Sequence, residues 1–468
     1  MASRGEIDPA AGGMSYDSFV RDRLPPPESQ PEFLFDLPEL CYPERLNAAV
    51  ELVDRAVAEG DGDQPAVAND HGVWTYAALK DLSDRIARLL VEEEGLVPGN
   101  RVFLRGPNGA MLFAAWLGIL KAGGIDVATM PILRPGEIAT ILKRAEISHA
   151  IVDSRYIGDF RQGAAEAGAL RSLLRYDGDY GKGELETRLA GIAPGFTPVD
   201  THRDDPAIIA FTSGTTGVPK GCIHFHRDIL APADSFARHI LKPAPGDRWA
   251  CSAPIAFTFG LGMQLIFPLR FRGCAVTVNQ PGPAALIDTI ERHGVTTLAT
   301  APTAYKAMLG MLDGRDIASL RTCISAGEHL PAATWHAWKD ATGIGIVDGI
   351  GSTEMMHIFI SASGADIRPG ATGKPVPGYR ACLLGEDGTP LAAPATGRLA
   401  VKGPTGCRYF DDPRQAAYVQ NGWNVTGDTY SEDEDGYFHY VARSDDMIVS
   451  SGYNIGAPEV ENALLGHP

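Results

Sequence analysis

Short apolar-rich runs alternate with amphipathic stretches through the first third of the chain. Apolar residues spaced three and four apart from residue 43 predict a helix, and Thr75 is placed to cap a second helix. Strands are then expected at 101–105, 125–130 and 149–153, and helices at 110–122 and 135–145. This alternation favours parallel βαβ units.

The alternation of strands and helices resumes after residue 205, and near residue 370 it gives way to a different pattern. Further strands are expected at 207–211, 297–300 and 322–325. Beyond about residue 370, Gly and Pro turns separate short alternating strands such as 380–384 and 397–402. Short strands divided by turns suit a small antiparallel barrel or sheet.

Charge and composition narrow the function classes. Over 468 residues, 41 Lys and Arg stand against 58 Asp and Glu, a formal charge of −17. Without a basic block, this balance argues against a general nucleic-acid binder. The seven cysteines form no CxxC pair, which suits a reducing compartment. Charged residues near the N-terminus predict no signal peptide, and the apolar run 110–120 is too short to span a bilayer. We expect a cytoplasmic protein without a membrane partner.

The segment 211–221, FTSGTTGVPKG, carries the strongest local chemistry. It follows a predicted strand and combines glycines, hydroxyl side chains and Lys220. Glycines let main-chain N–H groups approach an anion, and hydroxyls add donors. A flexible polar turn is the ordinary alternative. A P-loop is excluded, because Pro219 precedes Lys220 and Gly221 follows it. The segment is therefore interpreted as a phosphate-binding loop of another type.

This loop and three later segments, in the same order, resemble the signature motifs of the adenylate-forming superfamily. The later segments are 348–354 (DGIGSTE), 423–428 (WNVTGD) and 443–461, which begins RSDDMIVSSGYN. The resemblance extends over nearly the whole chain from about residue 40. It implies an α/β fold with a large N-terminal AMP- and acyl-binding domain at 1–442, built from two α/β sheets layered with helices plus a small β-barrel. Within it we expect a surface arm at 1–35 and a β-rich subdomain at about 370–442.

The resemblance also implies an ATP- and Mg²⁺-dependent ligase that joins a carboxylate to AMP. Lys220, Thr353 and Glu354 would be catalytic, with Glu354 holding Mg²⁺. The nucleotide would contact Thr212, Ser213, Gly214, Thr215, Thr216, Ser325, Ala326, Gly327, Glu328, Asp348, Gly349, Ile350, Gly351, Asp428, Tyr440 and Arg443. Ile350 stands where the commoner family pattern has an aromatic residue, so the contact to adenine stays apolar without stacking. Taken singly, each charged residue could equally be a solvated charge or a helix cap.

Aromatic and small residues gather in the segments expected to bind the acyl group. The acyl pocket is assigned to Phe257, Thr258, Phe259, Gly260, Gly327, Gly351, His357 and Ile358. Such a slot suits an aromatic ring better than a long alkyl chain. Two ordinary alternatives stay open: His357 could be a buried histidine bonded to the main chain, and the phenylalanines could belong to the core.

The segment 348–359 resembles the benzoate-CoA ligase branch, and 15–27 and 42–47 are similar to 2-aminobenzoate (anthranilate)-CoA ligases. These likenesses favour an aryl-CoA ligase acting on anthranilate or benzoate, with coenzyme A (CoA) as acceptor. Two alternatives are kept: a stand-alone adenylation enzyme that loads a carrier protein, and a nucleotide- and acid-binding body with little turnover. A homodimer is left open.

Residues 443–468 match the family's hinge and the start of a C-terminal lid domain. Asp445 corresponds to the hinge, and Gly452, Tyr453 and Asn454 would line the path of CoA. The resemblance places on the order of 100 residues after the hinge, the size of a small domain. We therefore expect a truncated lid domain that is largely missing, and a turnover lowered by loss of the family's C-terminal lysine.

Overall fold

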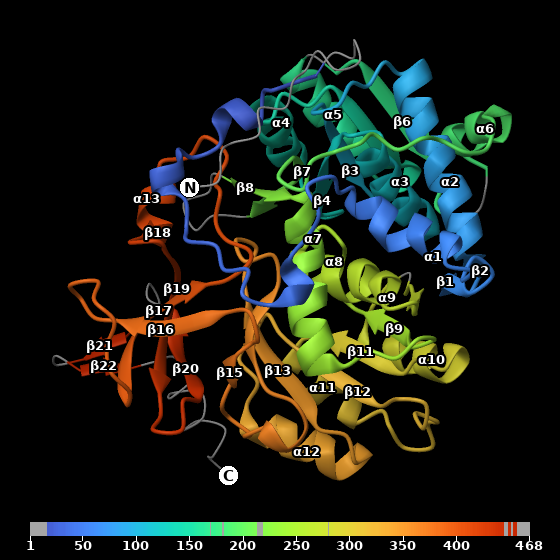
Figure 1. Ribbon diagram of the computed structural model, residues 1–468. Coiled ribbons are helices and arrows are strands. Elements are labelled where there is room, and N and C mark those ends of the chain that lie inside the picture. Colours follow the sequence, from blue (N-terminus) through green and yellow to red (C-terminus); the bar gives the residue numbers. More distant parts are fainter. Residues whose placement is uncertain are drawn as a thin grey trace.

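Two large β-sheets form the body, and a smaller third sheet lies against one flank (Figure 1). The structure, a computed structural model, describes residues 16–168, 170–179, 182–212, 219–278 and 280–443. It also describes the backbone of a short antiparallel pair, β21 (Ile448–Ser450) and β22 (Tyr453–Ile455). The predicted pair of α/β sheets is confirmed.

The first sheet has six strands in the order β6-β5-β3-β4-β7-β8. They are β3 (Arg101–Arg105), β4 (Ile125–Thr129), β5 (His149–Asp153), β6 (Ser172–Tyr176), β7 (Pro206–Thr212) and β8 (Lys220–Phe225). All pairs are parallel except β7 and β8, which form an antiparallel hairpin. The predicted phosphate loop joins these two strands, and their register places Thr212 opposite Lys220.

The second sheet has nine strands in the order β15-β14-β13-β12-β11-β9-β10-β1-β2. They are β1 (Pro65–Asn69), β2 (Gly72–Thr75), β9 (Arg248–Cys251), β10 (Cys274–Val276), β11 (Thr297–Thr300), β12 (Thr322–Ser325), β13 (Ile346–Gly351), β14 (Ile358–Ser361) and β15 (Lys374–Pro375). The six central strands, β13, β12, β11, β9, β10 and β1, run parallel. The antiparallel strands lie at the two edges, β2 at one and β14 with β15 at the other.

Helices cover both large sheets. Those of the first half are α1 (Arg55–Ala58), α2 (Tyr76–Arg88), α3 (Ala110–Lys121), α4 (Pro135–Arg144), α5 (Ile157–Ala167), α6 (Glu184–Gly191) and α7 (His226–Pro232). Those of the second half are α8 (Thr258–Leu261), α9 (Phe267–Arg270), α10 (Pro283–His293), α11 (Pro302–Leu309), α12 (Ala332–Thr342) and α13 (Gln415–Tyr418). Every residue of α3 is buried, which explains its uniformly apolar run. Thr75 caps α2, accepting a hydrogen bond from the main-chain N–H of Ala78 at 3.2 Å.

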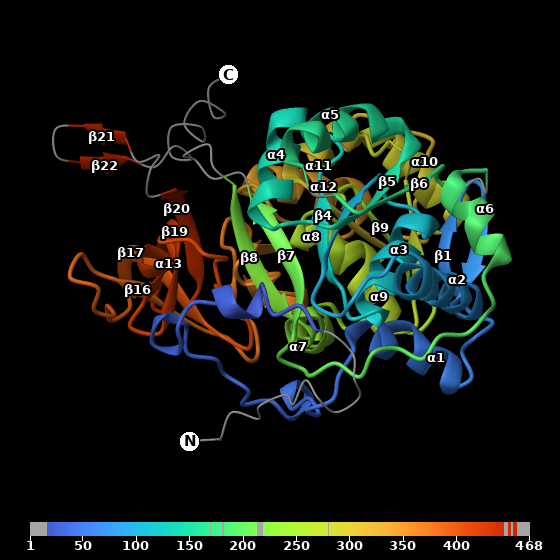
Figure 2. The ribbon, with the colours of Figure 1, turned by 90° about the horizontal axis from the view of Figure 1, so that it is seen from above.

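The third sheet is antiparallel and consists of β16 (Arg380–Leu384), β17 (Ala395–Lys402), β18 (Val419–Gln420), β19 (Trp423–Glu432) and β20 (Phe438–Arg443). Its order is β16-β17-β19-β18, and β20 pairs with β19. Among the described residues no pairing joins its outer strands into a ring. The expected barrel is therefore not confirmed, because closure requires the two outermost strands to pair with each other. In Figure 2, β7 and β8 lie between this sheet and the rest of the body.

The N-terminal arm, described from residue 16, ties the third sheet to the body. The N–H groups of Glu32 and Leu34 donate to the carbonyl oxygens of Gly422 and Gly403, each at 2.9 Å. Nearer the N-terminus, Asp17 forms an ion pair with Arg101 of β3. Within the described part of the chain, no helix combines the length and apolar character needed to cross a membrane.

Candidate active site

A polar cavity of about 540 Å³ opens where β8, β13 and the third sheet meet. It is lined by eleven of the residues expected at the nucleotide site or in catalysis: Lys220, Gly327, Glu328, Asp348, Gly349, Ile350, Gly351, Glu354, Asp428, Tyr440 and Arg443. These residues come from five separate segments of the chain. Thr212 and Ser325 do not line it, and Ser213, Gly214, Thr215 and Thr216 lie outside the described residues.

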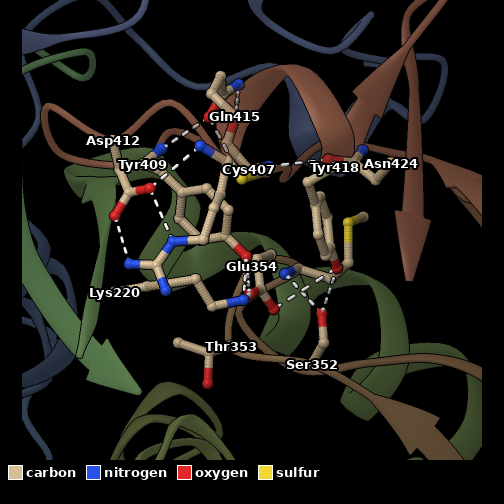
Figure 3. A network of polar contacts seen from close by, with 12 residues as sticks. Lys220, Ser352, Thr353, Glu354, Cys407, Tyr409, Asp412, Gln415, Tyr418 and Asn424 are labelled. Atoms are coloured by element: carbon tan, nitrogen blue, oxygen red, sulfur yellow. Dashed lines mark hydrogen bonds and ion pairs between the residues drawn. The ribbon is translucent and has the colours of Figure 1, made fainter. Parts of the chain in front are cut away.

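Glu354 lies at the centre of a polar network in this cavity (Figure 3). The hydroxyl of Tyr409 donates to Glu354 Oε1 at 2.5 Å and accepts from Lys220 Nζ at 2.9 Å. The hydroxyl of Tyr418 lies 3.5 Å from Glu354 Oε2. Burial, reinforced by the negative charge of Glu354, raises the pKa of Tyr409 far above its ordinary value, so its hydroxyl stays protonated.

Sequence reasoning missed Tyr409 and Tyr418. Both lie in the Gly- and Pro-rich part of the chain, where single tyrosines carry no periodic signal. The place of Tyr409 beside Glu354 depends on the pairing of the 408–410 segment with β8, in which Cys222 lies opposite Tyr409, and Tyr418 follows at the end of α13. No local pattern predicts a contact between such distant segments.

Asp428 and Arg443 lie side by side on neighbouring strands of the third sheet. They are register partners on β19 and β20, and Arg443 Nη1 lies 3.3 Å from Asp428 Oδ1. Burial raises the pKa of Asp428, and the nearby guanidinium opposes this shift only in part. The two oxygens of this carboxylate can accept from a pair of neighbouring hydroxyl groups.

Aromatic rings line the same cavity although Ile350 is aliphatic. Tyr440 stacks on His329 with centroids 5.7 Å apart and meets Tyr430 edge-on at 5.6 Å. All three rings border the cavity, and neither His329 nor Tyr430 was expected from the sequence. Asp348 lies nearby, and burial raises its pKa to about 8. The apolar surface of this cavity is thus supplied partly by the third sheet.

A second cavity of about 380 Å³ adjoins the first. Its lining residues are Ser252, Ala253, Phe257, Thr258, Phe259, Ala301, Ala326, Gly327, Gly351, Ser352, Thr353, His357 and Ile358. Gly327, Gly351 and Ser352 border both cavities, so the two meet there. Every expected acyl-pocket residue lines this cavity except Gly260, whose missing Cβ would collide with the carbonyl oxygens of Ala253 and Pro254. Gly260 is therefore a packing residue, and Ala326 lines this cavity rather than the first one.

His357 forms part of an aromatic wall. Its ring stacks with Phe236 and Phe259 at centroid distances of 5.6 and 5.7 Å. Nε2 donates to the carbonyl oxygen of Phe259 at 3.3 Å, and burial lowers the pKa of His357 to about 3. The histidine is therefore neutral at physiological pH. Both interpretations of this residue hold, since it is bonded to the main chain and also lines the cavity.

Thr353 joins the wall of the second cavity to the first sheet. Its carbonyl oxygen accepts from Nε2 of His224 at 2.8 Å. His224 lies on β8, so this bond ties Thr353, in the bend after β13, to a strand of the first sheet. Thr353 lines the second cavity next in sequence to Ser352, which borders both cavities.

No group of three or more His, Cys, Asp or Glu side chains that could hold a metal occurs among the described residues. Glu354 nevertheless offers a buried carboxylate in a polar cavity, the ligand type that Mg²⁺ takes when phosphate oxygens complete its shell. Asp445 and Gly452 lie outside the described residues, and Tyr453 and Asn454 are described only as backbone of β22. Their expected roles stay predictions.

Comparison with known proteins agrees with this geometry. The family model for AMP-binding enzymes matches residues 54–409. The benzoate-CoA ligase of Thauera aromatica is 35% identical over 92% of this chain and 82% of its own length.

Two solved structures are similar along most of their length. The anthranilate CoA ligase AuaEII, crystallised with anthranoyl-AMP, has a TM-score of 0.87 at 31% identity, covering 92% of this chain and 84% of that one. A benzoate CoA ligase from Burkholderia xenovorans LB400 has a TM-score of 0.82 at 29% identity, covering 90% and 84%. The predicted superfamily and its benzoate-CoA ligase branch are confirmed. The chain belongs to the AMP-binding enzyme family, as an AMP-forming acid–thiol ligase.

Proposed function

We propose that this enzyme activates an aromatic carboxylate with ATP and transfers the acyl group to CoA. The observation that carries the proposal is the meeting of the two cavities at Gly327, Gly351 and Ser352. One cavity presents carboxylates and cations, and the other presents aromatic and small side chains. A nucleotide phosphate in the first would thus lie next to a carboxylate in the second.

The first step joins two anions, so cationic and hydrogen-bonding groups must offset their repulsion. The carboxylate oxygen attacks the α-phosphate of ATP and pyrophosphate leaves, which gives an acyl-AMP. Lys220 supplies a point charge to the phosphates, and the Thr353 hydroxyl donates at the junction of the cavities. Asp428 accepts from the ribose hydroxyls, and Tyr440 packs against the base.

Glu354 would hold Mg²⁺, which screens phosphate charge when bound. The carboxylate is kept in place by Tyr409 and, at a longer distance, by Tyr418. In the second step a thiol attacks the acyl carbon and AMP leaves. We propose that CoA supplies this thiol and enters past residues 452–454 after rotation about Asp445.

The acyl cavity favours an aryl acid. Its wall of Phe257, Phe259 and His357 offers flat apolar faces, and Phe257 is 49% exposed, leaving its ring free to cover a substrate. The buried Thr258 adds a hydroxyl for a ring substituent. We favour 2-aminobenzoate (anthranilate), which is the acid of the anthranoyl-AMP bound by a similar structure, and keep benzoate beside it.

A substrate panel tests this function. Purified protein is incubated with ATP, Mg²⁺ and anthranilate, benzoate or octanoate, and acyl-AMP is measured by mass spectrometry with and without CoA. We expect acyl-AMP from the two aryl acids and acyl-CoA only when CoA is present. Preference for octanoate would contradict the aryl assignment. Acyl-AMP that CoA leaves unconsumed would favour a carrier protein as the acceptor.

A further inference from the structure

The hydroxyl group of Tyr409 lies between the two opposite charges of the nucleotide cavity. It accepts from Lys220 Nζ at 2.9 Å and donates to Glu354 Oε1 at 2.5 Å (Figure 3). Lys220 Nζ forms only a long ion pair with Glu354 Oε1, at 3.8 Å, beyond normal hydrogen-bond distance. The tyrosine therefore bridges a lysine and a glutamate that make no direct hydrogen bond to each other.

Without this hydroxyl the two charges would draw together. Their attraction is strong in a partly buried site, where water screens it weakly. The side chain of Lys220 is 23% exposed and that of Glu354 only 9%, so the flexible lysine would make most of the movement. A shorter, hydrogen-bonded ion pair would take the ammonium from the phosphates and neutralise the carboxylate that a cation requires.

Tyr409 is well placed to resist this movement because its own position is fixed. Its main-chain segment pairs with β8, through bonds from Ile223 N–H to Arg408 O and from Phe410 N–H to Gly221 O, each 2.8 Å. The N–H of Tyr409 donates to Gln415 Oε1 at 2.8 Å. The side chain of Tyr409 is almost fully buried.

Gln415 anchors this arrangement to the N-terminal arm. Its amide nitrogen donates to the carbonyl oxygens of Ser29 at 2.9 Å and Cys407 at 3.1 Å. With its oxygen bound by Tyr409, the buried amide has partners at both ends. It therefore fixes the segment that carries Tyr409 from the side opposite β8.

We propose that Tyr409 is a positioning residue that keeps Lys220 and Glu354 apart, so that Lys220 remains available to phosphate and Glu354 to a divalent cation. Gln415 supports it by fixing its main chain. The inference rests on the proposed function, since it assumes that this cavity binds ATP with Mg²⁺. It assigns to Tyr409 no contact with the reacting atoms.

The test compares ATP binding with saturating Mg²⁺ and with EDTA, by titration calorimetry. The quantity of interest is the ratio of the two dissociation constants, which reports how much Mg²⁺ tightens binding. In Tyr409→Phe we expect this ratio to fall about tenfold, the effect of one charge-assisted hydrogen bond. Adding Lys220→Met should return the ratio to that of Lys220→Met alone, because no cation is then left to pair with Glu354.

Tyr305→Phe is the matched control. This buried tyrosine donates to Leu298 O at 2.9 Å and Ile324 O at 3.0 Å and lines neither cavity, so its loss should leave the ratio unchanged. Thermal unfolding checks each variant. If Tyr409→Phe does not fold, Gln415→Leu replaces it, with an expected fall of about threefold.

The outcomes separate the two proposals. Wild-type protein that binds no ATP under either condition would overturn the proposed function and this inference with it. The inference alone would be overturned by a different pair of results. In that case the wild-type protein binds ATP more tightly with Mg²⁺, and a folded Tyr409→Phe variant shows the same ratio of dissociation constants. The inference would also be overturned if Tyr409→Phe lowered the ratio of dissociation constants and the double variant with Lys220→Met stayed below Lys220→Met alone. Tyr409 would then act on Glu354 without involving Lys220.

Discussion

The side-chain amide of Asn108 holds the main chain of Ala253 across the boundary between the two large sheets. Asn108 Nδ2 donates to Ala253 O at 3.0 Å, and its Oδ1 accepts from the N–H of Ile255 at 3.0 Å. Asn108 follows β3 of the first sheet, whereas the loop it binds leads from β9 of the second sheet to Phe257. One side chain thus fixes the loop that walls the acyl cavity.

Asn108→Ala should weaken binding of the aromatic acid without affecting ATP. Loss of two hydrogen bonds frees the loop, and we expect the dissociation constant of the acid to rise about tenfold. Calorimetry with anthranilate measures it. Asn69→Ala is the control, because this amide bonds Asp179 and Thr277 and touches neither cavity. Equal weakening in both variants would show a global effect instead.

Gly262→Ala should disturb the aromatic wall through His357. A Cβ at residue 262 would overlap Cδ2 and Nε2 of that ring, which is stacked between two phenylalanines and cannot yield easily. We expect at least a tenfold loss of aryl-acid affinity with ATP affinity preserved. Gly310→Ala, with nothing within 4 Å of the added methyl, should change neither. Unaltered acid binding in Gly262→Ala would show that His357 does not shape the pocket.

Asp428→Asn should reduce recognition of the ribose hydroxyls. A carboxylate accepts two hydrogen bonds at full charge, whereas the amide oxygen is neutral and its nitrogen donates. The wild-type protein is expected to bind ATP about tenfold more tightly than 2′,3′-dideoxy-ATP, and the variant to lose most of that preference. Competition binding with the two nucleotides measures the ratio. A preference that survives the substitution would place the ribose elsewhere.

Asp126 on β4 should make stability depend on pH. Burial raises its pKa to about 8, whereas an unfolded chain has an aspartate pKa of about 3.9. Between these values the folded state retains a proton that the unfolded state has released, so stability falls as pH rises from about 4 to 8.

The Asp126→Asn variant has a neutral side chain that does not titrate, so it lacks this pH-dependent contribution to stability. We therefore expect the unfolding temperature of the wild-type protein to fall relative to that of the variant as pH rises through this window. Thermal unfolding of both proteins from pH 5 to 8 measures the difference. A constant difference would mean that Asp126 ionises normally in the fold.

Sequence periodicity predicted the strands of the first sheet closely. The strands expected at 101–105 and 149–153 are found at those residues, and the helix expected at 110–122 spans Ala110–Lys121. Strand and helix periodicities reflect contacts between neighbours in the chain, which is why a single sequence reveals them. The ordered motifs likewise indicated the family and most of the residues that line the two cavities.

What tertiary structure alone decided is where distant segments meet. Tyr409 and Gln415 have no local signal, and their function depends on a segment pairing with β8 far earlier in the chain. Gly260 was expected in a pocket but faces main-chain carbonyl groups, because the packing of the chain, and not the residue type, decides which way a position faces. The sequence by itself determined the elements and the chemistry available; the three-dimensional packing decided which side chains hold that chemistry in place.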